Sequence, residues 1–255
     1  MPLAENPDLE KLEKYRGRII DVHAHLGPDQ RFLMRGTPEE ILEAYDRYGI
    51  RLGLVSSTIS LLAGAPEGNR HIRETVARHP DRFLPLFSLN PLYGRELAEQ
   101  LEREASLYVG VKFHPDYYHI QPSHPLSTPL LAKVAELGLP LMLHSYDGGI
   151  EAEKVAKAFP EMTVVAYHMG GTKWRECLRR AQRCDNMLLE ISSSVTERGM
   201  IEAAVEAVGS DRILFGTDVP YLDPAVSLGK VLGADINEHD VENILWRTAA
   251  KILKV

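Results

Sequence analysis

Short, continuous apolar runs recur along the chain and alternate with stretches in which apolar residues have helical spacing. Apolar runs that do not alternate with polar residues are typical of parallel strands covered on both faces. The pattern therefore predicts eight strands, at residues 18–26, 51–59, 82–90, 108–115, 139–145, 162–170, 186–194 and 212–220.

The stretches between these runs predict helices, at residues 38–49, 68–80, 94–107, 130–138, 150–160, 174–184, 197–209 and 238–253. The first of them follows Thr37, a suitable N-cap, has proline at its first position and ends at a glycine. Strand followed by helix, eight times, is the pattern of a (β/α)8 barrel of the TIM type. We expect one such α/β domain over residues 18–255, preceded by an N-terminal lead-in segment, residues 1–17.

A doubly wound open sheet is the competing architecture. In that fold a glycine-rich phosphate loop, GxGxxG, follows the first strand. Here the first run continues into "HAHLGP", which lacks that pattern. No linker or shift in composition marks a second domain, so the barrel is favoured.

Composition narrows the classes of partner. The formal charge of −7 argues against nucleic acid, whose phosphates need a basic surface. No apolar stretch reaches the length of a membrane span, and the N-terminus has no apolar signal region. The two cysteines, Cys177 and Cys184, lie seven residues apart on a predicted helix, too far apart for a disulfide. These features predict a cytoplasmic protein that acts on a small molecule.

Polar side chains gather where the predicted strands end. They are His23 and His25, Lys112 and His114, His144, His168, Glu190 and Ser192, and Asp218. In a barrel of this type these positions meet at one mouth, where the active sites of TIM barrels lie. A single buried histidine is usually a satisfied core residue. Here four histidines and one aspartate lie at the same level. If all five were ordinary core residues, the fold would need five independent and costly burials of polar groups.

The order of these motifs resembles that of the amidohydrolase superfamily, specifically the amidohydrolase-2 branch that includes the aminocarboxymuconate-semialdehyde decarboxylase-like proteins. The matching segments are "DVHAHLG", "GVKFHP", "LMLHS", "VVAYHMGG" and "ILFGTDVP". The resemblance implies a divalent metal, usually zinc, held by His23, His25, His144 and Asp218. It also implies that His168 stands beside the metal-bound water, or serves as a ligand of a second metal.

The chemistry of these residues agrees with that expectation. Neutral imidazoles and a carboxylate suit zinc, and an open position would make the site catalytic. We expect Asp218 and His168 to be the catalytic residues, with Asp218 exchanging protons with the metal-activated water. One metal per chain is favoured over two. Lys112 either lies near the substrate, bridges two metals as a carboxylated lysine, or is a salt-bridged structural residue.

Three further features have both functional and ordinary explanations. Asp21 would share the face of His23 and His25 and orient a ligand, or would make a polar contact in the barrel floor. Arg31 and Arg35 follow the first strand and could clamp a carboxylate, although most loop arginines are solvated. The aromatic loop 116–128 is a candidate pocket wall or an oligomer contact.

The leading functional hypothesis is a metal-dependent hydrolase that cleaves a C–N or C–O bond, in an amide, lactone or ester, of a small molecule expected to be anionic. The alternative within enzymes is a nonoxidative metal-dependent decarboxylase of a small carboxylic acid. A metal-free lactonase and a catalytically silent scaffold are further alternatives. The resemblance also raises the expectation of a homodimer.

Overall fold

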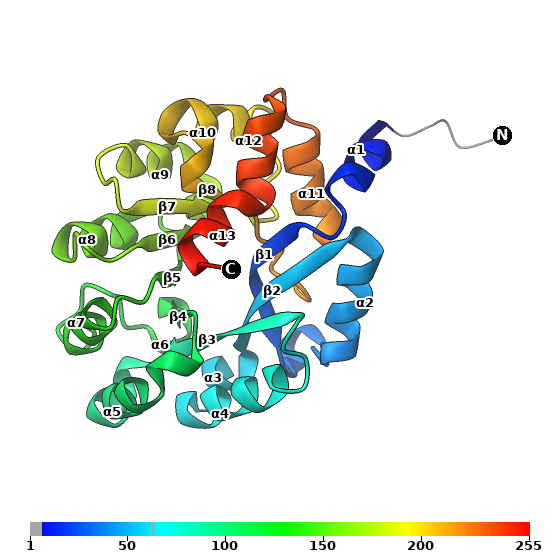
Figure 1. Ribbon diagram of the computed structural model, residues 1–255. Coiled ribbons are helices and arrows are strands. Elements are labelled where there is room, and N and C mark those ends of the chain that lie inside the picture. Colours follow the sequence, from blue (N-terminus) through cyan, green and yellow to red (C-terminus); the bar gives the residue numbers. More distant parts are fainter. Residues whose placement is uncertain (1–6, 63) are drawn as a thin grey trace.

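The computed structural model describes residues 7–62 and 64–255, and it is a TIM barrel of eight parallel strands surrounded by helices (Figure 1). The strands neighbour one another in chain order. They are β1 (Ile19–Leu26), β2 (Ile50–Ser57), β3 (Phe83–Leu89), β4 (Gly110–Phe113), β5 (Leu141–His144), β6 (Val164–Tyr167), β7 (Met187–Glu190) and β8 (Ile213–Leu214). The predicted barrel and all eight predicted strand positions are confirmed.

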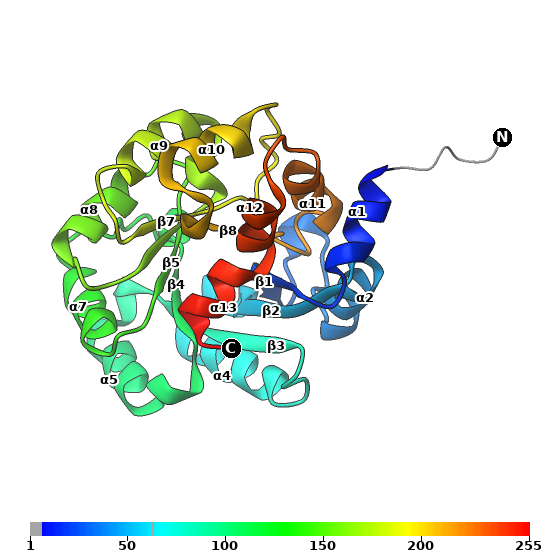
Figure 2. The same ribbon diagram turned by 45° about the horizontal axis from the view of Figure 1, so that its top comes forward.

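The helices form the outer layer and close one end of the barrel (Figures 1 and 2). They are α1 (Pro7–Tyr15), α2 (Pro38–Tyr48), α3 (Thr58–Leu62), α4 (Ala65–Val76), α5 (Gly94–Glu104), α6 (Pro115–Tyr118), α7 (Thr128–Glu136), α8 (Ile150–Ala158), α9 (Trp174–Ala181), α10 (Met200–Val208), α11 (Pro224–Leu232), α12 (Glu238–Glu242) and α13 (Thr248–Leu253). The pattern did not predict α11, α3 or α6. The predicted helix 238–253 is divided into α12, a π-helical segment (Asn243–Arg247) and α13.

Capping explains how α2 begins and ends. The Thr37 side chain accepts a hydrogen bond from the Glu40 amide while the Glu40 side chain accepts from the Thr37 amide, which is a capping box. Gly49 ends the helix in the left-handed region, at φ 71°. The sequence prediction for this helix is therefore confirmed at both ends.

The lead-in segment contains a helix of its own. Residues 1–6 lie outside the described residues, and α1 follows them beside α11. The Lys11 ammonium donates to the Leu232 carbonyl at the end of α11, over 3.0 Å. No helix in the described ranges is both long enough and apolar enough to cross a bilayer.

The buried side chains form two layers. The larger layer lies between strands and outer helices, and the smaller fills the inside of the barrel, where Ile20, Val22, Leu54 and Val165 meet. Ala249 of α13 belongs to this inner layer, and Figure 2 shows α13 crossing the centre of the ring of strands. Because α13 closes one end of the barrel, a site can form only at the other end, where the strands have their C-terminal residues.

An irregularity in β1 turns its histidines inward. The register of β1 against β2 shifts between Asp21 and Ala24, so β1 carries one residue more than its partner. Ile20 and Val22 therefore point into the barrel, and beyond the shift His23 and His25 do so as well. Asp21 points outward instead, toward Tyr45 of α2.

β8 closes the barrel against β1 mostly through irregular backbone. Beyond the two regular residues of β8, three backbone hydrogen bonds join the following segment to β1. The Val22 amide donates to the Phe215 carbonyl (3.0 Å), the Asp218 amide to the His23 carbonyl (2.7 Å) and the His25 amide to the Val219 carbonyl (2.8 Å). These bonds place Asp218 directly beside the two β1 histidines.

Candidate metal centre

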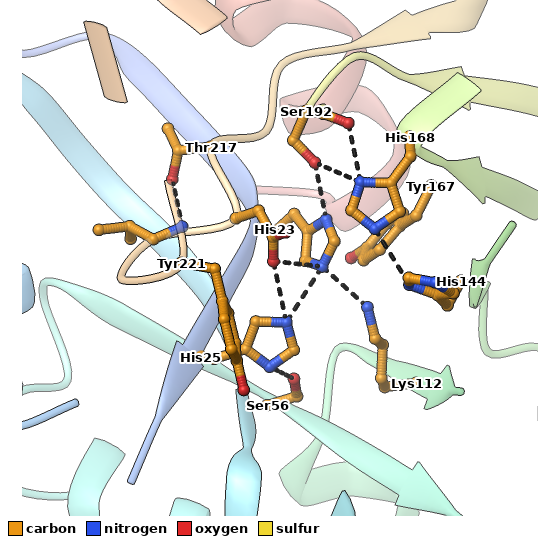
Figure 3. Close-up of polar contacts among 12 residues, drawn as sticks. His23, His25, Ser56, Lys112, His144, Tyr167, His168, Ser192, Thr217 and Tyr221 are labelled. Atoms are coloured by element: carbon orange, nitrogen blue, oxygen red, sulfur yellow. Dashed lines mark hydrogen bonds and ion pairs between the residues drawn. The ribbon is translucent and has the colours of Figure 1, made fainter. Parts of the chain in front are cut away.

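Three atoms capable of binding a metal converge at the open end of the barrel (Figure 3). His23 Nε2 and His25 Nε2 lie 3.2 Å apart, and Asp218 Oδ1 lies 3.3 Å from the first and 3.2 Å from the second. Two ligands each about 2.1 Å from one ion lie about 3.0–3.4 Å apart in octahedral or tetrahedral geometry. The triangle therefore has the dimensions of one face of a metal coordination shell.

The hydrogen bonds around His23 leave its Nε2 without a proton. Its Nδ1 lies 3.1 Å from Glu190 Oε2 and 3.0 Å from Ser192 Oγ, so Nδ1 carries the proton and donates. The Lys112 ammonium, which can only donate, lies 2.9 Å from His23 Nε2. The His23 Nε2 lone pair thus faces both Lys112 Nζ and a carboxylate oxygen of Asp218, a position that favours positive charge.

Local backbone structure brings Asp218 to this position. Asp218 has φ 62°, a left-handed conformation that is uncommon for a residue other than glycine. Asp21 accepts from the Thr217 amide (3.0 Å), from the Thr217 hydroxyl (2.5 Å) and from the Tyr45 hydroxyl (2.8 Å). A Cβ on Gly216 would lie 2.2 Å from Glu190 Oε1, so only glycine fits there. Buried hydrogen bonds and close packing therefore fix an unfavourable backbone at the site.

Burial and pairing act against each other at Asp218. Burial works to raise the pKa of its carboxyl, but the hydrogen bond with His25 and the nearby His168 and Lys112 outweigh burial and lower the pKa. The same burial lowers the pKa of His25. Anionic carboxylate and neutral imidazole are the protonation states that bind a divalent metal.

Lys112 lies beneath the triangle and is almost inaccessible, with 1% of its surface exposed. Its Nζ contacts His23 Nε2 and sits 4.0 Å above the centre of the Tyr167 ring. Burial lowers the pKa of Lys112 to about 7, although Asp218 and Glu190 oppose that shift. Lys112 is therefore part of the site, but no carboxylate forms a direct ion pair with it in the described chain.

His144 and His168 form a second group on the adjacent wall. His144 Nδ1 and His168 Nε2 lie 3.0 Å apart. His144 Nε2 lies 3.1 Å from Asp116 Oδ2, and His168 Nδ1 lies 2.8 Å from the Ser192 carbonyl oxygen, so each imidazole donates to an acceptor on its far side. The two nitrogens that face each other are then both bare, unless a proton or a cation lies between them. The ring nitrogens of His144 thus contact His168 and Asp116, not the triangle, and its service as a metal ligand stays a prediction.

Glu190 and Ser192, at the end of β7, connect the two groups. Glu190 accepts from the Ser192 hydroxyl (2.8 Å), from the His168 amide (3.1 Å) and from His23. Burial raises the pKa of Glu190 to about 7, opposed by these hydrogen bonds. Glu190 and Ser192 therefore have a buried hydrogen-bonding role in the site.

A pocket of about 350 Å³ opens above the triangle. His25, His144, His168 and Asp218 line its polar part. His114 and Ser194 also line it, and its other walls are formed by Phe32, Leu61, Tyr117, Tyr146, Tyr221 and Leu222. Tyr221 packs edge-on against His25, with ring centres 5.3 Å apart. The pocket is therefore suited to a small planar molecule with a polar group directed at the metal ligands.

A buried carboxylate ties together three loops at the pocket rim. Asp29 is inaccessible to solvent and accepts from Arg31 Nη2 (2.6 Å), Arg31 Nε (3.0 Å) and the Tyr221 hydroxyl (2.8 Å). Arg31 also contacts the Tyr117 hydroxyl (2.5 Å). The loops that follow β1, β4 and β8 are thus held by one ion pair. Arg31 braces the aromatic walls, whereas Arg35 pairs with Glu40 on the surface.

This brace predicts an acid-sensitive contribution to stability. Hydrogen bonds from Arg31 lower the pKa of Asp29 to about 2, below the unfolded value of about 3.9. The stabilisation is therefore complete above about pH 4 and is lost as the pH falls through 2. We expect Asp29→Asn to cost about 1–2 kcal/mol at pH 7, discounted for the half-exposed Arg31, and clearly less near pH 2, where the carboxyl is half protonated. Urea unfolding at both pH values checks this, and an equal cost at both would contradict it.

The structure brings the predicted site residues to one mouth of the barrel, but sequence reasoning missed the residues that support them. The expectation that Asp21 shares the face of the histidines was wrong, because the extra residue in β1 follows Asp21 and turns only the histidines inward. Asp21 instead holds the His23 amide (2.9 Å) and Thr217. Tyr167, whose ring centre lies 3.8 Å from that of His23, and Asp116 were not singled out. The one sequence signal that could have identified Tyr167 is that it directly precedes His168.

Known proteins are similar to this chain in sequence pattern and in fold. An amidohydrolase family model matches residues 20–255. No curated protein sequence matches the chain. Among solved structures, 5-carboxyvanillate decarboxylase from Sphingomonas paucimobilis is similar at 17% identity and TM-score 0.74, with 94% of this chain and 100% of that chain covered.

Two further structures are similar over most of the barrel. A 2,6-dihydroxybenzoate decarboxylase bound to 2,6-dihydroxybenzoate has TM-score 0.76 at 18% identity, with 94% of this chain and 100% of that chain covered. A dihydroxybenzoic acid decarboxylase from Polaromonas sp. JS666, with bound manganese and 2-nitroresorcinol, has TM-score 0.73 at 20% identity, with 94% and 97% covered. These likenesses confirm the fold. With the family model matching nearly the whole chain, the protein belongs to the amidohydrolase family.

Proposed function

We propose that this protein is a metal-dependent enzyme that decarboxylates a small aromatic carboxylic acid without oxidation. The observation that carries the proposal is the triangle of His23, His25 and Asp218 at the floor of an aromatic pocket. The activities named for the similar structures support decarboxylation, which was the alternative sequence hypothesis, over the leading hypothesis of hydrolysis.

The residues present fit a divalent metal. Two neutral imidazoles and one carboxylate, with ligand atoms 3.2–3.3 Å apart, would hold it, and His144 is the predicted fourth ligand. When bound, the ion supplies positive charge that polarises and orients substrate oxygens at the pocket floor. Zinc is the expectation from the donor set, and the manganese in one similar structure makes manganese an equal candidate.

The chain's own residues then have two tasks, which are to orient the substrate acid and to transfer one proton. In the reaction the bond between the ring and the carboxyl carbon breaks, the electron pair stays on the ring carbon, that carbon takes up a proton and CO₂ leaves. Asp218 and His168 line the pocket and are the groups proposed to relay this proton from water, since the Asp218 carboxylate is anionic and His168 Nε2 is free to accept a proton. Burial lowers the pKa of His168 to about 3, so it is neutral at physiological pH, with its proton held at Nδ1 by the Ser192 carbonyl.

The aromatic walls determine the class of substrate. Tyr117 and Tyr221 are held in place through Asp29 and Arg31, and Phe32 packs edge-on against Tyr221 at 5.2 Å. Rings offset or edge-on to one another gain about 0.5–1.5 kcal/mol per pair beyond area burial. A single-ring acid would bind with its ring among these walls and its carboxylate toward His25.

Hydrolysis of an amide, lactone or ester is the second candidate function. It would use the same donor set, because a metal flanked by imidazoles and a carboxylate also activates water. The two functions differ in the fate of the substrate carbon.

The test is a product analysis on metal-loaded protein. The protein, loaded with manganese or zinc, is offered a panel of hydroxybenzoic acids labelled at the carboxyl carbon, beside a panel of aromatic amides, lactones and esters. The proposal predicts labelled CO₂ and, in heavy water, one deuterium on the product ring. Cleavage confined to the second panel would establish hydrolysis instead, and no turnover on either panel would overturn both.

A further inference from the structure

The loop after β7 is held from two opposite sides. On its inner side the Ser192 carbonyl accepts from His168 Nδ1 (2.8 Å), and the Ser192 hydroxyl lies 3.0 Å from His23 Nδ1. On its outer side the Lys230 ammonium, reaching from α11, donates to the Ile191 carbonyl (2.9 Å) and the Ser193 carbonyl (2.7 Å). The same short segment therefore contacts the metal centre and a distant helix.

The two sets of contacts depend on each other. In extended backbone, successive carbonyls point to opposite sides, so fixing the carbonyls of Ile191 and Ser193 on one side aims that of Ser192 to the other. That carbonyl can only accept, so it decides that His168 carries its proton on Nδ1. The position of the Lys230 ammonium is thereby linked to the tautomer of a histidine in the pocket.

We infer that Lys230 is a positioning residue, which holds the Ile191–Ser193 backbone so that Ser192 orients His168 and His23. The inference rests on the proposed metal centre for its functional meaning, although its structural part stands without a metal. Lys230 does not touch the pocket. It acts through the backbone of the β7 loop, as groups beyond the ligands commonly do in metal sites.

The charge of Lys230 suits this role. Burial lowers the pKa of Lys230 to about 8, with Glu190 opposing the shift, so the ammonium is still mostly charged at pH 7. Hydrogen bonds from charged donors are stronger than those from neutral donors. Two such bonds, to the carbonyls of Ile191 and Ser193, hold the backbone of the β7 loop in place.

The chain offers a matched control. Lys11 also donates its ammonium to a carbonyl near the end of α11, that of Leu232, but has no contact with the β7 loop. Lys230→Met and Lys11→Met therefore each remove a charged lysine contact that involves α11, and only the first removes support from Ser192. Thermal unfolding of both variants measures the loss that is merely structural.

Two measurements distinguish a positioning role of Lys230 from a purely stabilising one. Long-range ¹H–¹⁵N spectra of the metal-free protein report the imidazole tautomers, and titration with Mn²⁺ or Zn²⁺ reports affinity. We expect Lys230→Met to convert His168 from one tautomer, protonated at Nδ1, to a mixture, and to weaken metal binding on the order of 10-fold. Lys11→Met should leave both readouts at their wild-type values.

An unchanged His168 spectrum with unchanged metal affinity in Lys230→Met would overturn the inference. If that variant does not fold, Lys230→Arg takes its place, because its terminal nitrogens lie one bond further from Cα and shift the same carbonyls. A His168 spectrum identical to wild type in Lys230→Arg would then overturn it. If wild type binds no metal, the proposed function fails, and the tautomer spectra still decide the role of Lys230.

Discussion

Replacing Asp218 with asparagine should reduce decarboxylation by about 10²–10⁴-fold, the contribution typical of a group that transfers a proton. Asparagine has nearly the same shape, so the backbone at φ 62°, which asparagine tolerates well, should persist. What disappears is the negative charge facing His23 and His25 across 3.2–3.3 Å. The measurement is kcat and KM on the best substrate of the acid panel, with circular dichroism to verify folding.

A control lies five residues further along the same segment. Asp223 caps α11 by accepting from the Ala225 amide (2.8 Å) and makes no contact with the triangle. Asparagine is as good a cap as aspartate, so Asp223→Asn should leave both stability and activity unchanged. Full activity in Asp218→Asn would refute a catalytic role for that carboxylate.

Replacing His168 with asparagine should lower kcat by about 10²–10⁴-fold while KM and metal content change little. The reason is that His168 lines the pocket and contacts His144, but its nitrogens do not belong to the triangle of His23, His25 and Asp218. Asparagine again tolerates the left-handed backbone of this position, at φ 62°. Steady-state kinetics together with metal analysis check the prediction.

The matched control for this variant is His119→Asn. His119 is an exposed residue that also has a left-handed backbone, at φ 53°, and it lies outside the pocket lining. We expect its substitution to have no effect on kcat. Loss of bound metal from His168→Asn would instead show that His168 is a ligand, as the two-metal alternative requires.

Much of the fold could be predicted because it follows from local patterns. Buried parallel strands appear as apolar runs, and α2 shows its cap, proline and glycine in the sequence. The helix α11 was missed although Asp223 and Pro224 carry the same start signal. The irregularity in β1 could not be foreseen, because it depends on pairing with β2 and on Asp21 finding Tyr45 and Thr217.

The candidate site, like the fold, has features that follow from the local sequence and others that depend on distant contacts. Position at a strand end is a local property, so His23, His25 and Asp218 could be grouped before the structure was known. The rotation of each ring depends on distant partners, such as Glu190 for His23 and Asp116 for His144. Lys230 acts on backbone carbonyls almost forty residues away, a contact for which no side-chain motif exists.

The central claim is that the β1 histidines and Asp218 hold one divalent cation. Its most direct test is the metal content of the protein after loading with Mn²⁺ or Zn²⁺ and removal of free ions, measured by mass spectrometry for wild type and for His25→Ala. Neutral imidazoles set at coordination spacing around a carboxylate predict about one ion per wild-type chain and far less in the variant. Wild-type protein free of metal after loading, or a variant that retains as much metal as wild type, would contradict the account.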